Sequence, residues 1–456
     1  MLFNSHVFIF WFLPLVLAGY YAMPFRHRSG LLLVASYIFY GWWNPIFCSL
    51  MLVSTCIDYV AGKQIYQATR HRTRRGFLIL SLGANLLLLG FFKYYGMFSA
   101  TANALVQSEF LPLWSIVLPI GISFYTFQSM SYSIDIFRGA AKPTRTFLDF
   151  ACYVSLFPQL IAGPIVRFHE IDQQLITRDH TFAKGAEGAY RFIFGLAKKV
   201  LIADAMASVA DPAFAAADIS GAAAWVGLLA YSFQIYFDFS GYSDMAIGLG
   251  LMFGFRFPEN FTMPYHAHSI SDVWRRWHMT MSNWFRDYLY IPLGGNRHGV
   301  ASTLRNLIIT MFLAGLWHGA SWTFVVWGLY HGILLVFDRT VFRVLRTIPR
   351  SVQRMYTFLL VTLGWVLFRS PSFASAFEYF RSLFTFSSPA GSVDLLNRTT
   401  LGIVLIGAFL IFIEPRVPSA PKRYGPVPAL LMGLVFLVCL VVIHGNTASP
   451  FIYFQF

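Results

Sequence analysis

The chain reads Trp274-Arg-Arg-Trp-His278, Trp284-Phe-Arg-Asp-Tyr-Leu-Tyr-Ile-Pro-Leu-Gly-Gly295 and Gly315-Leu-Trp-His-Gly319 within one stretch of an otherwise apolar sequence. Each of the two histidines in these motifs follows a tryptophan. Polar and titratable groups are costly at membrane depth, and they usually mark functional positions there. His318 is therefore the first candidate for a catalytic base.

The composition is that of a membrane protein. Of the 456 residues, 57% are hydrophobic and only 12% are charged, whereas soluble domains carry about 25% charged residues. The net charge of +14 comes from short loops between apolar runs, as the positive-inside rule predicts. No basic face of the kind that binds nucleic acid is visible. We expect an all-α polytopic membrane protein that contacts membrane lipid and does not bind nucleic acid.

Apolar runs divide the chain into predicted spans. Val7 to Met23 has no Lys or Arg before it and Arg26 after it, which predicts a retained span rather than a cleaved signal peptide. Leu31 to Ala61 is broken at Asn44-Pro45 and predicts two spans. Phe150 to Ile165 contains two prolines and a glycine, which favours a re-entrant segment. Further spans are predicted at Phe77–Phe92, Leu113–Ile136, near Val200, and at Ala222–Phe237, Leu304–Trp317, Trp322–Phe337, Phe358–Phe368, Leu401–Ile413 and Ala429–Ile443.

The count is about eleven transmembrane helices, plus re-entrant and interfacial pieces. No low-complexity linker interrupts the chain. We therefore predict a single membrane-embedded domain over residues 1–456, which ends in a short aromatic tail at 446–456.

The first motif predicts an amphipathic helix at the cytoplasmic interface. Ser271 can cap a helix that begins at Asp272. At 100° per residue, Trp274, Trp277 and His278 share one face with other aromatic residues, and charged residues take the opposite face. His278 is then either a buried histidine bonded to a carbonyl or a group that positions the substrate or donor. The charged residues of the polar face include Arg276, Arg286 and Asp287.

The second histidine, His318, ends an apolar run and precedes Gly319, a candidate C-cap residue. Histidine has the unperturbed pKa that suits proton transfer near neutral pH, and attack of a hydroxyl on a thioester needs such a base. His331 is a similar candidate, but it lies within a span and we interpret it as structural. The cysteines are scattered and no His-Glu-x-x-His motif is present, so we predict no metal site.

Two carboxylates lie among aromatic residues and glycines in Tyr236-Phe-Asp-Phe-Ser-Gly-Tyr-Ser-Asp244. Asp238 or Asp244 could orient a histidine. Each could equally cap a helix end or form an ion pair, and the sequence leaves both interpretations open.

These motifs resemble those of the membrane-bound O-acyltransferases, and most closely the bacterial branch that acetylates alginate, peptidoglycan and cellulose. The resemblance also covers Phe12-Leu-Pro14, Ser36-Tyr-Ile-Phe-Tyr40, Phe157-Pro-Gln-Leu-Ile-Ala-Gly-Pro164, Phe237-Asp-Phe-Ser-Gly-Tyr-Ser-Asp244 and Val366-Leu-Phe-Arg369. It implies a ring of tilted helices around a tunnel that crosses the bilayer. It also implies that His318 is essential, that His278 faces the same tunnel, and that a cytoplasmic donor, acetyl-CoA, supplies the acyl group without a tightly bound cofactor.

The substrate- and donor-binding residues that we infer from these motifs are Trp274, Arg276, Trp277, Arg286, Asp287 and Trp317. Arg276 and Arg286 could meet the phosphates of the donor, or they could contact lipid headgroups.

The last residues, Ser449-Pro-Phe-Ile-Tyr-Phe-Gln-Phe456, resemble the C-terminal motif of a small helper protein of teichoic-acid D-alanylation. Lys422 and Arg423 are the last charged residues, which places the tail outside if they lie inside. We hypothesise that Tyr453 accepts the acyl group and passes it to an extracytoplasmic acetyltransferase. The alternative is that Tyr453 is an interfacial aromatic anchor.

Together these features predict an O-acyltransferase of the bacterial inner membrane that acetylates a cell-surface polysaccharide. The alternatives are D-alanyl transfer from a carrier protein by the same fold, and a polytopic flippase or scaffold without chemistry.

Overall fold

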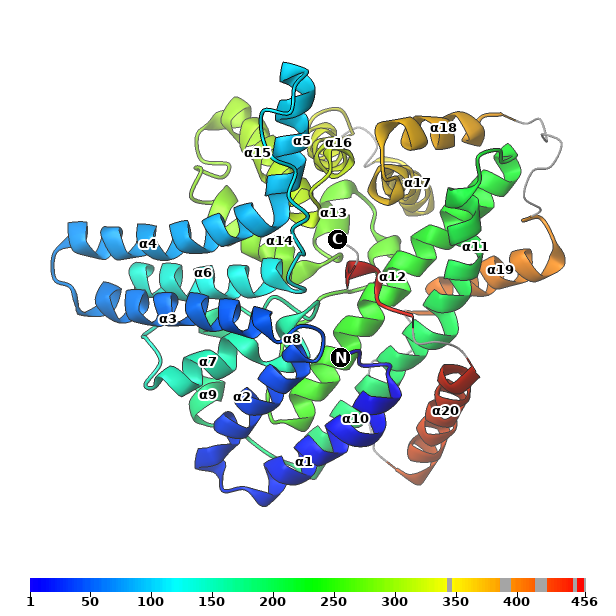
Figure 1. Cartoon of the computed structure of the whole chain (residues 1–456). Coiled ribbons are helices and arrows are strands. Elements are labelled where there is room, and N and C mark those ends of the chain that lie inside the picture. The colour runs from blue at the N-terminus through cyan, green and yellow to red at the C-terminus, as the bar shows by residue number, and fades with distance from the viewer. Residues whose placement is uncertain (343–346, 386–394, 415–424, 446–448, 455–456) are drawn as a thin grey trace. The chain divides into compact units, whose positions relative to one another are not determined.

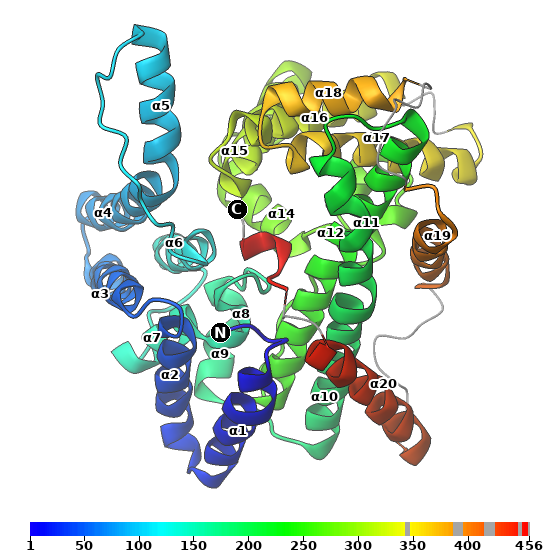
Figure 2. The same cartoon turned by 45° about the vertical axis from the view of Figure 1, so that its right-hand side comes forward.

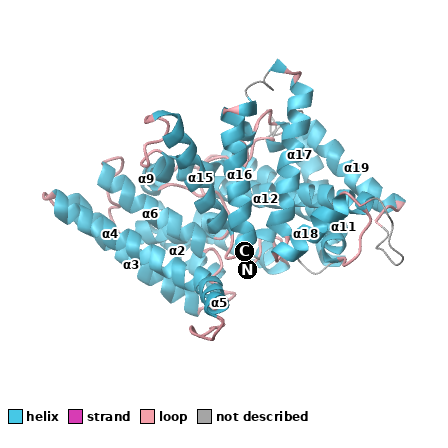
Figure 3. Cartoon of the chain, turned by 90° about the horizontal axis from the view of Figure 1, so that it is seen from above, coloured by secondary structure: helices cyan, strands magenta, loops and turns pink. Residues whose placement is uncertain are grey.

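The computed structural model describes all residues except 343–346, 386–394, 415–424, 446–448 and 455–456. Within the described residues, every regular element is a helix, and turns or loops connect them (Figure 3). The contacts group the chain into two compact units. Helices α10 (Phe182–Ala197) and α12 (Gly221–Met252) contribute residues to both units. The single domain predicted from the sequence stays a prediction.

The first unit comprises Met1–Phe194, Tyr242–Pro258 and Ala420–Phe454. Helices α3, α4 and α6 lie side by side in it (Figure 1), and α5 continues beyond the end of α4 (Figure 2). Its elements are η1 Val7–Phe12, α1 Leu13–Ala22, α2 Phe25–Gly41, α3 Ile46–Gln67, α4 His71–Leu89, η2 Gly90–Tyr94, α5 Tyr95–Val106, α6 Ile122–Arg138, α7 Phe147–Ser155, α8 Phe157–Leu160, α9 Phe168–Ile176, α20 Pro426–Gly445 and η8 Ile452–Phe454.

The break at Asn44-Pro45 is confirmed, because α2 ends at Gly41 before it and α3 begins at Ile46 after it. The helix expected from Leu113 is wrong in its start, because α6 begins only at Ile122. Gly121 precedes it with φ +77°, a left-handed conformation that favours glycine. The proline-rich run after Phe150 forms two short helices, α7 and α8, and its re-entry into a membrane stays a prediction.

The second unit comprises Gly195–Gly241 and Glu259–Ser419. It contains both histidines of the Trp-His motifs. Its elements are η3 Lys198–Ala203, α11 Asp204–Ala215, the first part of α12, η4 Pro264–His266, α13 Ile270–Trp274, α14 Met279–Phe285, η5 Arg286–Tyr290, α15 Gly299–His318, α16 Trp322–Arg339, α17 Arg350–Arg369, α18 Phe373–Leu383 and α19 Arg398–Ile413.

Among the residues that the structure describes, five helical segments are long and apolar enough to cross a membrane: Ile46–Gln67, His71–Val106, Gly299–His318, Arg350–Arg369 and Pro426–Gly445. The helices Val7–Ala22 and Arg398–Ile413 are shorter and also apolar. This is the pattern of a multi-pass membrane protein.

Glycines bring α15 and α16 into close contact beside the Trp-His-Gly motif. A Cβ atom at Gly315 would lie 2.4 Å from the carbonyl oxygen of Phe324 and 2.9 Å from the Cα atom of Gly328. Both neighbours are backbone atoms, so neither can move without shifting a helix. This close packing fixes the end of α15, where His318 lies.

We expect Gly315→Ala to destabilise the protein by about 1–3 kcal/mol or more, because overpacking here acts on backbone atoms. The matched control is Gly402→Ala, because a Cβ atom at Gly402 in α19 meets nothing within 4 Å. Thermal unfolding in detergent should show a lower Tm for Gly315→Ala alone. Equal Tm values for the two variants would contradict the close packing.

Candidate functional site

The helix predicted to begin at Asp272 is interrupted at the Trp-Arg-Arg-Trp-His motif. Helix α13 ends at Trp274, and α14 begins only at Met279. The predicted cap at Ser271 is also wrong, because the Ser269 side chain accepts the hydrogen bond from the backbone N–H of Asp272 at 3.2 Å.

The segment before α13 causes the interruption. Its backbone groups form hydrogen bonds with N–H and carbonyl groups that would pair with each other in a continuous helix. The N–H of Thr262 donates to the Arg276 carbonyl at 3.0 Å, and the N–H of Met279 donates to the Asn260 carbonyl at 2.9 Å. Helical periodicity cannot reveal such a distant partner. Thr280, which follows the interruption, is buried.

His278 occupies the point of interruption in a left-handed conformation, with φ 43° and ψ 53°. Such a conformation is uncommon for a residue other than glycine, and it often marks a functional position. The side chain is fully buried, at 0% exposure. Its ring packs edge-on against Phe239 with centroids 4.7 Å apart.

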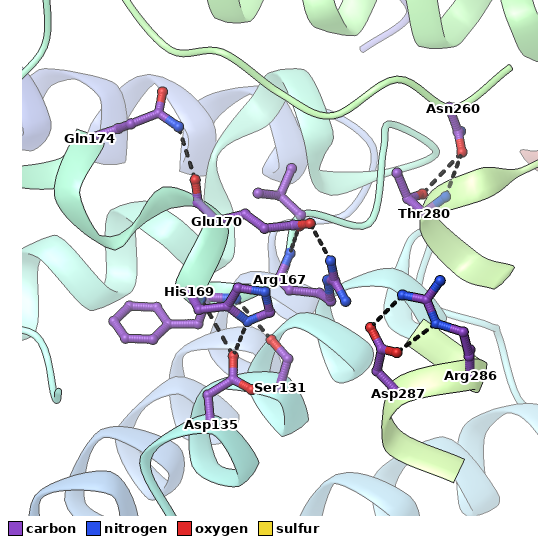
Figure 4. Close-up of polar contacts among 12 residues, drawn as sticks. Ser131, Asp135, Arg167, His169, Glu170, Gln174, Asn260, Thr280, Arg286 and Asp287 are labelled. Carbon is purple, nitrogen blue, oxygen red and sulfur yellow. Dashed lines mark hydrogen bonds and ion pairs between the residues drawn. The ribbon is translucent and has the colours of Figure 1, made fainter. Parts of the chain in front are cut away.

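Asn260 orients the His278 ring. The side-chain oxygen of Asn260 lies 3.1 Å from Nδ1 of His278. The same oxygen accepts hydrogen bonds from the hydroxyl and the N–H of Thr280, and Figure 4 shows these two bonds. A carboxamide oxygen can only accept, so Nδ1 of His278 carries the proton. Nε2 of the neutral ring then has the lone pair. Asn260 thus selects the tautomer of His278.

His318 is the last residue of α15, and the expected C-cap at Gly319 is confirmed. Its side chain is only 3% exposed. The imidazole is surrounded by rings of Trp317, Trp327 and Phe368, with centroids at 5.1, 5.0 and 5.4 Å. Such surroundings exclude bulk water and strengthen electrostatic interactions inside.

The two imidazoles come together although 39 residues separate them in the sequence. The ring centroids of His278 and His318 are 6.4 Å apart, and the Trp317 ring lies 5.9 Å from that of His278. Two imidazoles in a largely apolar, aromatic setting can accept and return a proton, which is the chemistry of general acid–base catalysis.

The titration of His278 gives a testable pH dependence of stability. Burial lowers the pKa of His278 from 6.5 to about 3, so the folded protein keeps this ring neutral while the unfolded chain protonates it. The contribution to stability is therefore present above pH 6.5 and is lost as the pH falls toward 3. At pH 5 the loss is about 2 kcal/mol.

Unfolding of the purified protein at pH 7.5 and pH 5 measures this effect. The wild-type Tm should fall more between the two pH values than the Tm of His278→Asn, whatever the stability of the variant at pH 7.5. An identical fall in both proteins would show that His278 does not carry the pH dependence.

The tryptophans of the motifs are packed into this aromatic cluster. Trp277 is buried against Trp365, with centroids 4.9 Å apart. Trp274 lies 5.9 Å from Trp327, and Trp327 in turn contacts His318. The predicted aromatic residues thus form the walls around the histidine pair.

The charged residues of the motif lie farther out. Nε of Arg276 donates to Asp272 at 3.0 Å. Arg286 and Asp287 form a two-point ion pair with each other at 2.7 and 3.0 Å (Figure 4), and the Arg286 side chain is 55% exposed. A carboxylate thus holds each of the two guanidinium groups, and that of Arg286 also faces solvent.

Both carboxylates of α12 form ion pairs. Asp238 pairs with Lys199 at 2.8 Å, and both side chains are at most 3% exposed. Asp244 pairs with Arg191 at 3.0 Å within the first unit. Asp238 directly precedes Phe239, whose ring contacts His278, so the placement of α12 links this carboxylate to the histidine.

Tyr453 belongs to the first unit, as part of η8. The tail before it is docked on that unit, because the Asn4 side chain donates to the Ser449 carbonyl at 3.2 Å and Phe451 packs edge-on against Tyr242 at 4.7 Å. Residues 446–448 and 455–456 of the predicted tail, and the charges at 422 and 423, lie outside the described residues.

Sequence reasoning missed Asn260, Thr280 and Lys199. None of the three belongs to a motif that the sequence singles out. Among the residues that the structure describes, no three His, Cys, Asp or Glu side chains gather as metal ligands would.

Comparison with known proteins places these residues in a family. Residues 140–370 match the membrane-bound O-acyltransferase family. A probable alginate O-acetylase of Azotobacter vinelandii is 42% identical over an alignment that covers 100% of both chains. One from Pseudomonas syringae pv. tomato is 48% identical, over 88% of this chain and 78% of its own. A peptidoglycan O-acetyltransferase of Helicobacter pylori is 40% identical, over 84% and 80%.

Proposed function

Because the chain belongs to the membrane-bound O-acyltransferase family, we propose that it uses an acetyl thioester from the cytoplasm to O-acetylate a cell-surface polysaccharide. The names of its relatives support the acetyl group and the polysaccharide. The observation that carries the proposal is the pairing of His278 and His318 at 6.4 Å inside a buried aromatic cluster.

In the proposed step, an imidazole nitrogen of His318 takes the proton of the attacking hydroxyl. The hydroxyl oxygen forms a bond to the thioester carbonyl carbon, and the carbon–sulfur bond breaks. The leaving thiolate takes the proton back from His318, so that base and acid are the same residue. The neutral His278, with its lone pair on Nε2, positions the reacting groups.

We further assign acetyl-CoA as the donor and the bacterial inner membrane as the location. The exposed Arg286 and the partly exposed Arg276 suit the phosphates of such a donor. The finer architecture that we propose is about eleven spans in a ring around a tunnel, with His318 lining that tunnel.

Base-labile acetate from surface polysaccharide tests this function. A strain without the protein should lack this acetate, and the wild-type chain should restore it. Loss of D-alanine esters instead would favour D-alanyl transfer, and an unchanged polymer would favour a flippase or scaffold.

We also propose that Tyr453 is an acyl relay. Its phenol oxygen would attack the acetyl thioester, lose its proton to a base, and hold the acetyl group as a tyrosyl ester while the thiol leaves. An acceptor hydroxyl on an extracytoplasmic acetyltransferase or on the polymer would then take the acetyl group and regenerate the phenol. The docking of Phe451 supports a positioned tail, because that residue is buried in protein rather than exposed to lipid.

Tyr453→Phe should reduce polymer acetylation to near that of the deletion strain, because it removes only the nucleophilic oxygen. The control is Tyr66→Phe, at an exposed tyrosine of α3, which should keep full acetylation. Acetate released from the purified polymer gives the comparison. Normal acetylation in Tyr453→Phe would refute the relay and leave Tyr453 as an aromatic anchor.

A further inference from the structure

The first unit has an apolar groove on its surface, between the neighbouring helices α2, α3 and α7 (Figure 1). The groove has a volume of about 650 Å³, within the range of about 300–1,000 Å³ that is typical of ligand sites. None of its lining residues that the structure describes is charged. Val34, Ile38 and Leu52 are exposed along it, whereas Ala151 is buried at its base. An apolar chain can therefore enter the groove from the surface.

The surroundings of the groove are predicted to be hydrocarbon. Helix α3, which lines it with Cys48 and Leu52, is long and apolar enough to cross a membrane. At that depth the molecules that meet an apolar groove are lipid acyl chains. A chain gains little apolar burial when it moves from the bilayer into the groove, because lipid tails are as apolar as leucine. A preference for one lipid must therefore come from its headgroup.

Both helices that form the long walls of the groove have a basic residue on the same face, farther along. Lys63 lies 11 residues after Leu52 in α3, and Arg26 lies 11 residues before Tyr37 in α2. Eleven residues make about three turns and about 16 Å of helix. This length is close to the depth of one leaflet, about 15 Å. A lipid chain along Leu52 and Tyr37 would thus have its phosphate beside Lys63 and Arg26.

Side-chain contacts connect the groove to this basic end. The ring of Phe147, which lines the groove, lies 5.4 Å from that of Tyr59. The Nζ atom of Lys63 lies 4.6 Å from the centre of the Tyr59 ring. A Cβ atom at Gly30 in α2 would lie 3.6 Å from Cδ1 of Leu148 in α7. The beginnings of α2 and α7 and the end of α3 therefore meet at one end of the unit.

Positive charge predominates at that end. Residues 24–30, 63–75 and 138–149 together contain ten Lys or Arg side chains and one acidic residue, Asp149. The Asp149 carboxylate accepts a hydrogen bond from the Thr146 hydroxyl. Arg74 joins two of these segments, because it donates to the carbonyls of Ile65 at 3.1 Å and Phe137 at 2.9 Å. Basic clusters beside membrane helices attract anionic lipid headgroups.

We propose that the groove between α2, α3 and α7 binds an anionic phospholipid. One acyl chain lies in the groove, and the phosphate lies beside Lys63 and Arg26. A soluble anion would leave the groove empty, and a lipid without net charge would gain nothing from the surplus of positive charge. The site is separate from the histidine pair, and it does not depend on the reaction that the protein catalyses.

Photo-crosslinking with lipids of the two charge types tests this site. The full chain is reconstituted in vesicles of phosphatidylcholine. The probes are phosphatidylglycerol and phosphatidylcholine with the same photoactivatable group on one acyl chain, and mass spectrometry locates the labelled peptides. Residues 33–52 should be labelled several-fold more by the anionic probe. Lys63→Gln should reduce this preference about fivefold, the effect expected from one basic residue near a membrane surface.

Two further pairs of variants separate the groove from general effects. Val34→Trp fills the groove and should abolish the labelling of residues 33–52, whereas Leu87→Trp, at an exposed position of α4 outside the groove, should preserve it. Arg398→Gln removes an exposed charge from α19 and should keep the preference.

Three results would overturn the site. The first is equal labelling of residues 33–52 by the two probes, which indicates unselective contact with bulk lipid. The second is unchanged labelling in Val34→Trp. The third is a preference that Lys63→Gln leaves intact, or that Arg398→Gln reduces equally.

Discussion

His318→Ala should reduce acetylation of the surface polysaccharide to the level of a strain that lacks the protein. A general base contributes about 10²- to 10⁴-fold to the rate, and no water can replace it easily where the side chain is 3% exposed among aromatic rings. Because Ala removes the imidazole without adding volume, the ring cluster should remain folded around it.

Released acetate and the amount of protein in the membrane should be measured together. The matched control is His27→Ala, at an exposed histidine of α2, which should keep wild-type acetylation. If His318→Ala is present at normal levels and the polymer is still acetylated, His318 is not the base.

Lys199→Met should cause the largest loss of stability among the single substitutions considered. It leaves the Asp238 carboxylate without its partner at 2.8 Å, in a position where the side chain is 2% exposed. Removal of one member of a buried ion pair costs about 3–5 kcal/mol, because the remaining charge stays buried. Acetylation should fall as well, since α12 holds the Phe239 ring against His278.

The double variant Lys199→Met with Asp238→Leu distinguishes the stability lost through an unpaired buried charge from the stability lost through altered packing. Replacement of a buried ion pair by apolar residues is often close to neutral. Lys199 also pairs with Asp204 at 2.7 Å, but the Asp204 side chain is 30% exposed and remains partly solvated, so the double variant should still recover most of the Tm that the single variant loses. Thermal unfolding of the three proteins in detergent provides the comparison. An unchanged Tm in Lys199→Met would refute a stabilising role for the pair.

The sequence was a good guide wherever local chemistry decides the structure. Apolar runs predicted the membrane-length helices, Asn44-Pro45 predicted a break, and Gly319 predicted the end of the helix that carries His318. These features depend on neighbours along the chain, which a sequence pattern records.

The sequence was a poor guide wherever distant partners decide. The interruption before Met279 depends on hydrogen bonds from the segment around Asn260, so helical periodicity predicted a continuous helix there. The pair of Lys199 with Asp238 joins elements that are 39 residues apart, and neither residue indicates the other.

The central claim is that His318 transfers acetyl groups from a cytoplasmic donor. Inverted membrane vesicles expose the cytoplasmic face to added acetyl-CoA, and the label to follow is a radioactive acetyl group. The acceptor polysaccharide is enclosed in the vesicles, and the protein lies in their membrane. Vesicles with the wild-type protein should accumulate labelled ester on the acceptor, and vesicles with His318→Ala should accumulate none. Equal labelling by the two proteins would contradict the claim.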